Sequence, residues 1–179
     1  MTCQAKMWVI GSKGVIQPKS LLQTVMNIPA WGISKFQWGS PYTHIAIAPN
    51  PKRDPLMCWE AVSGGVKYHE WEPLKAGYDL FYVPCTKEQL LNAMLFLKAQ
   101  EGKGYDYMGL FGFLWRSNKW QNDSKWFCSE LAAAAMERGG FDEGPNFNVV
   151  SPHQLNPAIL LATAKGPYSL SEVRNEGRA

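Results

Sequence analysis

Charged side chains are scarce in this sequence and are not clustered. Asp, Glu, Lys and Arg make up 18% of the 179 residues, below the roughly 25% of an average soluble domain. The formal net charge is only +3 and is spread along the chain, which argues against a dedicated nucleic-acid binder. Hydrophobic residues account for 46%, which excludes an intrinsically disordered chain. A chain of this length predicts one compact domain.

The sequence also lacks a long apolar run. Its longest apolar stretch, Tyr107 to Leu114, is too short to cross a bilayer and predicts a buried helix instead. The segment from Met1 to Ile10 has no basic region followed by a long apolar run and a cleavage site, so it does not resemble a secretory signal. We therefore expect synthesis in the cytoplasm and no integral membrane segment. Any encounter with material outside the cell would then require export by another route, release on lysis or carriage on a phage particle.

Cysteine is infrequent, and its positions follow neither a disulfide nor a zinc pattern. The four residues show no CxxC motif and no regular spacing: Cys3, Cys58, Cys85 and Cys128. We interpret them as thiols. Two histidines, His69 and His153, offer further metal ligands, but neither has the compact spacing from a cysteine that zinc sites show. The sequence therefore predicts neither a metal site nor another cofactor.

Five segments have the composition and length of β-strands. They are Met7 to Ile10, Thr43 to Ala48, Met57 to Val62, Val66 to His69, and Tyr78 to Pro84. A glycine-rich turn separates the third from the fourth, which predicts a hairpin. Internal repeats and an internal domain boundary are both lacking.

Apolar residues at helical spacing predict helices between and after these strands. One begins near Pro18 and ends at Asn27. Another follows the capping-box signature Thr86-x-x-Gln89 and reaches about Gln100. Five residues are expected on its apolar side: Leu90, Leu91, Met94, Leu95 and Leu97.

The sequence WFCSELAAAAMER, from Trp126 to Arg138, consists largely of strong helix formers and predicts a third helix. Asp123 or Ser124 is a candidate N-cap, and Gly139-Gly140 is a stop signal. We expect a single catalytic domain over residues 1–164. The polar segment 165–179 is expected to be a frayed tail.

Three residues in these elements have the chemistry of a cysteine nucleophile and its partners. Cys128 lies in the first turns of a predicted helix, where the helix dipole favours a thiolate. His44 begins a strand, and Glu60 is an acid inside an apolar strand, where an unpaired charge would be costly. A Cys-His-acid arrangement needs these residue types. The alternatives are a buried structural cysteine and a structural histidine. Glu130 is expected to be a surface or ion-pairing carboxylate outside the site.

These residues and their order resemble the circularly permuted, NlpC-type papain-like cysteine amidases and peptidases, the YiiX-like proteins and relatives of lecithin retinol acyltransferase. The matching motifs are Thr-His-Ile-Ala-Ile, then Trp-Glu-Ala, then Phe-Cys-Ser-Glu-Leu, with Gly-Tyr-Asp before the cysteine and Val-Ser-Pro after it. The resemblance covers most of residues 7–160. It implies an α+β, permuted papain-like fold, in which a small antiparallel sheet carrying His44 and Glu60 packs against the helix carrying Cys128.

The resemblance also implies an acyl-enzyme on Cys128, with His44 as base and Glu60 as orienting acid, but it does not identify the substrate. We expect cleavage of an amide bond in a peptide, cell-wall or N-acyl substrate. A thioesterase or acyltransferase acting on an acyl lipid, and an inactive lipid- or peptide-binding module, are the alternatives. Tyr105 is a candidate oxyanion donor, and Trp126 is a candidate cleft residue. Either ring could instead fill a small core.

Overall fold

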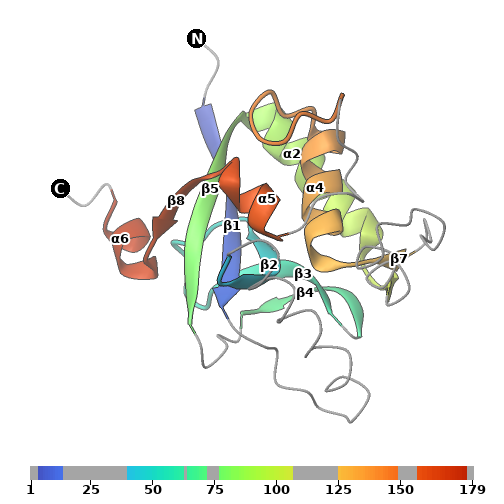
Figure 1. Cartoon of the computed structure of the whole chain (residues 1–179), viewed down its shortest axis with the longest axis horizontal. Helices are drawn as coiled ribbons and strands as arrows, with labels where there is room; N and C mark the ends of the chain where they lie inside the picture. The colour runs from blue at the N-terminus through green and yellow to red at the C-terminus, as the bar shows by residue number, and fades with distance from the viewer. Residues whose placement is uncertain are drawn as a thin grey trace.

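The chain folds as an α+β protein around one six-stranded antiparallel sheet (Figure 1). The computed structural model describes residues 4–13, 40–62, 64–71, 77–106, 125–148 and 157–176. The strand order is β4-β3-β2-β1-β5-β8. The strands are β1 (Gln4–Lys13), β2 (Tyr42–Ala48), β3 (Met57–Val62), β4 (Gly65–Glu70), β5 (Tyr78–Thr86) and β8 (Lys165–Tyr168). The α+β class and the antiparallel sheet expected from the sequence are confirmed.

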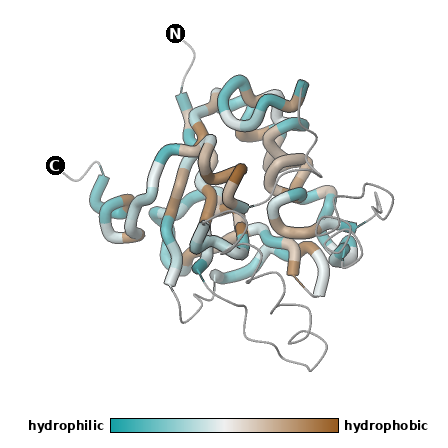
Figure 2. The backbone as a smooth tube through the Cα atoms, viewed as in Figure 1, coloured by the Kyte–Doolittle hydropathy of each residue, from teal (hydrophilic) through white to brown (hydrophobic). Residues whose placement is uncertain are grey.

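The central strand β1 is buried on both faces, and this divides the core into two layers. Met7 and Val9 face the larger layer, whereas Trp8 and Ile10 face the smaller one. The larger layer lies between the sheet and three helices: α2 (Lys87–Gln100), α4 (Cys128–Gly139) and α5 (Pro157–Ala162). Figure 2 shows apolar residues along α4 and α5, whereas α6 (Leu170–Asn175) is mostly polar. Because side chains alternate between the two faces of a strand, β1 contributes residues to both layers.

Helix α2 begins as the sequence predicts, and it buries part of the face expected to be apolar. The side chain of Thr86 accepts a hydrogen bond from the backbone of Gln89, and the Gln89 side chain accepts one from the backbone of Thr86. Leu91 and Leu95, expected on the apolar side, are instead 58% and 57% exposed. The expectation was wrong for these two, because the five residues span more of the helix than one neighbouring surface contacts. The other three pack in the larger core layer: Leu90, Met94 and Leu97. The face that packs against α4 buries Ala93, Leu97 and Gln100.

The predicted hairpin is present as β3 and β4, and it carries part of the candidate site. Six register pairs join the two strands, from Met57 with Glu70 to Val62 with Gly65. Gly65 has a φ of 93°, and a Cβ at this position would overlap the carbonyl oxygen of Lys103. Because that carbonyl also accepts a hydrogen bond from the N–H of Val66, the turn is held against the end of α2. A glycine here satisfies both the positive φ and the close approach.

The segment predicted to be a frayed tail belongs to the sheet, and that expectation was wrong. β8 pairs with β5, and α6 follows it with Val173 buried. Tyr168 completes a group of three rings, with its centroid 6.1 Å from that of Trp8 and 5.8 Å from that of Tyr82. The segment is polar overall, but a few apolar residues at the right positions anchor it to the smaller core layer. The average composition of the segment does not reveal these apolar positions.

Several sequence predictions fall on residues outside the described ranges. These are the helix near Pro18 to Asn27, most of the aromatic segment 107–126 and the Val-Ser-Pro motif at 150–152. Within the ranges that are described, none of the helices has both the length and the apolar composition needed to cross a membrane.

Candidate active site

Cys128 is the first residue of helix α4, closer to the helix terminus than the sequence indicates. The helix begins two residues later than expected, and the residue at the N-cap is Phe127, not Asp123 or Ser124. The first backbone N–H groups of a helix have no partner inside the helix, and the dipole is positive at this end. The sulfur of Cys128 therefore lies where a negative charge is stabilised. The predicted stop is confirmed, since Gly140 adopts the left-handed conformation at the C-cap.

Glu130, expected to be a surface or ion-pairing carboxylate, is not at the surface. Its side chain is buried, with 2% of the residue exposed. One carboxylate oxygen accepts a hydrogen bond from the backbone N–H of Phe127 at 3.3 Å. A carboxylate in the first turn also interacts favourably with the helix dipole. Glu130 thus helps to fix the start of the helix that carries Cys128.

His44 and Glu60 form a buried hydrogen-bonded pair between β2 and β3. Nε2 of His44 lies 2.6 Å from Oε2 of Glu60, and both residues are less than a tenth exposed. The His44 ring is also parallel to that of Trp71, with an interplanar angle of 6° and a centroid distance of 6.3 Å. An ionised carboxylate only accepts hydrogen bonds, so the imidazole donates its Nε2 proton. This arrangement fixes the ring and leaves Nδ1 free to face the thiol.

The third predicted member, Cys128, meets His44 from the helix side. The imidazole and the thiol act on each other, and the charge and hydrogen bonding of His44 lower the pKa of the Cys128 thiol. Hydrogen bonding from the backbone of Ile45 and Ser129 lowers it further. The three residues that the sequence singles out, 84 positions apart at the extremes, therefore form one continuous row from Cys128 through His44 to Glu60.

The charges of this row stabilise one another. Burial alone would lower the pKa of His44, but the adjacent sulfur of Cys128 and the carboxylate of Glu60 together raise it to about 10. Burial alone would raise the pKa of Cys128, but the charge and hydrogen bond of His44 outweigh that effect and lower it. The pKa of Glu60 is also lowered, against its burial, by hydrogen bonds and charges from two imidazoles. A thiolate, an imidazolium and a carboxylate are thus the favoured ionisation states.

A fourth residue, His69, belongs to the row, and the sequence analysis missed it. Nε2 of His69 lies 2.6 Å from Oε1 of Glu60, the oxygen not used by His44. The two side chains come from neighbouring strands of the hairpin, where Cys58 is directly opposite His69 and Glu60 is two residues further along β3. Diagonal neighbours on one face of a hairpin are within reach of long side chains. Working out the strand register of the predicted hairpin would therefore have identified His69 as a neighbour of Glu60.

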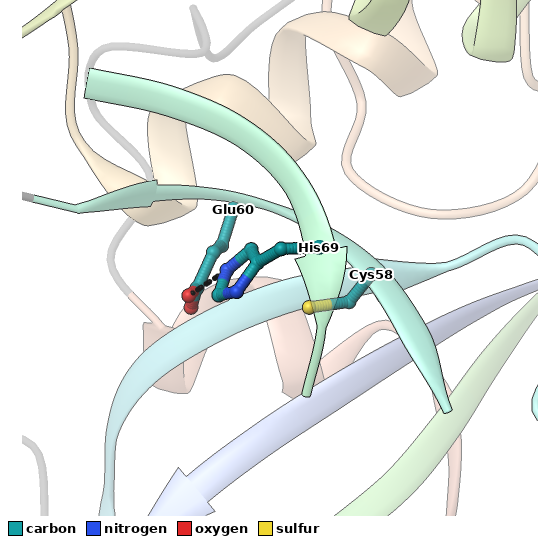
Figure 3. Close-up of side chains that lie close together, drawn as sticks. All are labelled: Cys58, Glu60 and His69. Atoms are coloured by element: carbon teal, nitrogen blue, oxygen red, sulfur yellow. Dashed lines mark hydrogen bonds and ion pairs between the residues drawn. The ribbon is translucent and has the colours of Figure 1, made fainter. Parts of the chain in front are cut away.

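Cys58, Glu60 and His69 also form a group of potential metal ligands, which sequence spacing did not predict (Figure 3). One donor atom of each lies within 4.8 Å of the others. However, two ligands of a tetrahedral zinc ion, each about 2 Å from it, are separated by about 3.3 Å. The 2.6 Å between His69 and Glu60 is instead a hydrogen-bond distance. Burial also raises the pKa of the Cys58 thiol, with a further increase from the charge of Glu60. His69 and Glu60 are therefore hydrogen-bonded to each other, and a metal ion could bind between them only by separating them.

Tyr105 and Trp126 lie together on the two short parallel strands β6 (Gly104–Tyr105) and β7 (Lys125–Trp126). The indole N–H of Trp126 donates to the side chain of Gln100 at 3.2 Å, and its ring meets that of Phe96 edge to face. Both rings are half-buried against the larger core layer. These contacts explain Trp126 as a residue of β7 that packs against α2. Its role toward a substrate, like that of Tyr105, stays a prediction.

In comparisons with known proteins, no family model matches the chain, and no curated protein or solved structure matches it significantly. Arguments about function therefore rest on the geometry and chemistry of this site.

Proposed function

We propose that the protein is a cysteine hydrolase that cleaves an amide bond through an acyl-enzyme on Cys128. The observation that carries the proposal is the buried row in which Cys128 contacts His44 and His44 contacts Glu60. Cysteine nucleophiles need a lowered thiol pKa, a neighbouring base and a group that orients the base. Each of these requirements has a named residue here. Burying a thiolate, an imidazolium and a carboxylate has a large desolvation penalty, so stability alone does not explain these three groups in the core.

The reaction would begin from the thiolate and imidazolium pair. The sulfur of Cys128 attacks the carbonyl carbon, and the oxyanion of the tetrahedral intermediate is stabilised by backbone N–H groups at the start of α4. The intermediate collapses to a thioester as the imidazolium of His44 gives its proton to the departing amine. His44 then takes a proton from water, which attacks the thioester, and the carboxylic acid product leaves as the thiolate and imidazolium are restored. Throughout, Glu60 orients the ring and balances its charge.

The order of the residues along the chain supports a permuted papain-like arrangement as part of this proposal. The strand with His44 and the strand with Glu60 both precede the helix with Cys128. The contacts of α4 with β2 and β3, and the effect of His44 on the Cys128 thiol, support this arrangement. An NlpC-type amidase of the permuted, YiiX-like branch, related to lecithin retinol acyltransferase, is therefore the family we propose.

Substrate profiling tests the proposal and separates amide cleavage from its alternatives. Purified protein would be incubated with labelled amide, ester and thioester acyl donors, and the intact mass would be followed. We expect a transient acyl adduct that maps to Cys128 and is lost in Cys128→Ala. Cys85→Ala is the matched control, because Cys85 is a buried thiol of β5. Turnover of esters or thioesters alone would favour the thioesterase or acyltransferase. Binding without any adduct would favour the inactive module.

A further inference from the structure

The carboxylate of Glu60 is shared by two imidazoles, and its two oxygens are divided between them. Oε2 is 2.6 Å from Nε2 of His44, and Oε1 is 2.6 Å from Nε2 of His69. The side chain of His44 is 4% exposed, that of Glu60 9% and that of His69 38%. The row therefore runs from the buried thiol to a histidine that reaches solvent.

A carboxylate bonded at only one oxygen can rotate about its terminal torsion, because that torsion is broad and has no sharp staggered minima. A donor on each oxygen removes this freedom. The second donor here is held by the β3–β4 hairpin, whose register places Cys58 opposite His69. A buried carboxylate oxygen without a donor would also be costly. His69 therefore supplies both the restraint and the missing hydrogen bond.

We propose that His69 is a positioning residue that holds the Glu60 carboxylate against His44. The inference rests on the proposed function for its significance, since it assigns a fourth residue to the same site. It requires no contact between His69 and the substrate. Through Glu60, His69 maintains the orientation and the protonated state of the imidazole that serves Cys128.

The described ionisable groups near His69 include Lys67 and Glu70 on its own strand and Cys58 on β3. Lys67 and Glu70 on β4 are exposed, and Lys67 is directly opposite Glu60 in the register. Cys58 on β3 faces His69, and its raised pKa keeps it a neutral thiol. Among the described residues, the charges that act on Glu60 are those of the two histidines. Lys67 is thus a matched control for a change of charge near Glu60 without loss of a hydrogen bond.

Histidine NMR gives a direct test, because the chain has only three histidines. The titration midpoint of His44 would be measured in the wild type, His69→Ala, His69→Gln and Lys67→Ala. We expect His69→Ala to lower the midpoint by about one pH unit, because an incorrectly oriented carboxylate stabilises the imidazolium less. His69→Gln places an amide N–H near the former Nε2 and should stay within a few tenths of the wild type. Lys67→Ala should do the same.

A double-mutant cycle with Glu60→Gln decides whether His69 acts through Glu60. In that background, His69→Ala should produce no further shift. An equal shift in both backgrounds, or an unchanged midpoint in His69→Ala, would overturn the proposal. If His69→Ala does not fold, His69→Asn replaces it, since its shorter amide does not reach Glu60. The midpoint is read without any substrate, so a protein that hydrolyses nothing but shows these shifts would contradict the proposed function and still support the role of His69.

Discussion

Oε2 of Glu60 lies 2.6 Å from Nε2 of His44, although the strands that carry them are barely paired. Within the described chain, the register between β2 and β3 consists of one pair, Ile47 with Trp59. Ile45 follows His44 on β2 and is paired with Gly11 of β1, and hydrogen bonding from its backbone lowers the pKa of the Cys128 thiol. Two successive residues of β2, His44 and Ile45, thus act on the thiol, whereas β3 contributes the carboxylate that orients the imidazole.

Cys128 should be the most reactive thiol in the folded protein. Near neutral pH, iodoacetamide should label it at least about tenfold faster than Cys3, Cys58 or Cys85, because its pKa is lowered whereas burial raises those of Cys58 and Cys85. Intact mass and peptide mapping measure the rates. Cys85→Ala should leave the fast phase unchanged, and Cys128→Ala should abolish it. Fast labelling that persists in Cys128→Ala would contradict the assignment of the nucleophile.

The rate of amide cleavage, measured as substrate turnover, should follow a bell-shaped dependence on pH. The acidic limb reflects formation of the thiolate below the usual thiol pKa, and the alkaline limb reflects loss of the His44 proton near pH 10. Glu60→Gln removes a charge that raises the pKa of His44, so the alkaline limb should move to lower pH by about one unit. Glu70→Gln is the control, since it removes the same charge from an exposed position of β4. An alkaline limb that does not move in Glu60→Gln would exclude Glu60 as the orienting acid.

Glu60 should also contribute to stability in a pH-dependent manner. Its pKa is lowered from the ordinary 4.5, so the contribution is present above about that pH and is lost as the pH falls through the lowered value. Glu60→Gln should therefore reduce the free energy of unfolding at pH 7 by about 1–3 kcal/mol. The difference from the wild type should shrink below pH 4.5. Urea unfolding at pH 7 and at pH 3.5 measures both values, and a gap that widens in acid would contradict the assigned ionisation.

The C-terminal elements should be required for full stability. Val173 of α6 is 2% exposed, and Val173→Ala should lower the free energy of unfolding by about 1–3 kcal/mol. Asn175→Ala, at an exposed position of the same helix, should change the free energy of unfolding by less than about 0.5 kcal/mol. Thermal and urea unfolding compare the two. Equal effects would mean that α6 does not pack against the sheet as described.

Local signals predicted the elements of the fold well, whereas composition averages did not. The capping box at Thr86 and Gln89 and the glycine stop after α4 depend on backbone geometry within a few residues, so the sequence contains them directly. The exposed pair Leu91 and Leu95 shows the opposite case. Which side of a leucine-rich helix is buried depends on the partner surface, and that is a tertiary property.

The candidate site shows the same division. Cys128, His44 and Glu60 could be selected because each has an unusual local setting for its chemistry. His69 could not be selected in this way, since its role depends on the strand register that brings it diagonally opposite Glu60. Glu130 was expected to be a surface or ion-pairing carboxylate because, two residues after Cys128, it points away from the nucleophile on a helix. It is buried, and the helix terminus and the Phe127 N–H compensate for its burial.

The position of Cys128 at the very start of α4 has a consequence for folding. His44 and Ile45, which act on the thiol, come from β2, far earlier in the chain, so the sulfur lacks their effect until the helix docks on a formed sheet. Contacts between distant segments form late, because the entropy of closing the loop is lost before the contacts can compensate for it. The enhanced reactivity of this thiol toward an alkylating agent therefore develops only at the end of folding. Pulsed labelling of Cys128 at successive times during refolding would therefore measure when α4 docks on the sheet.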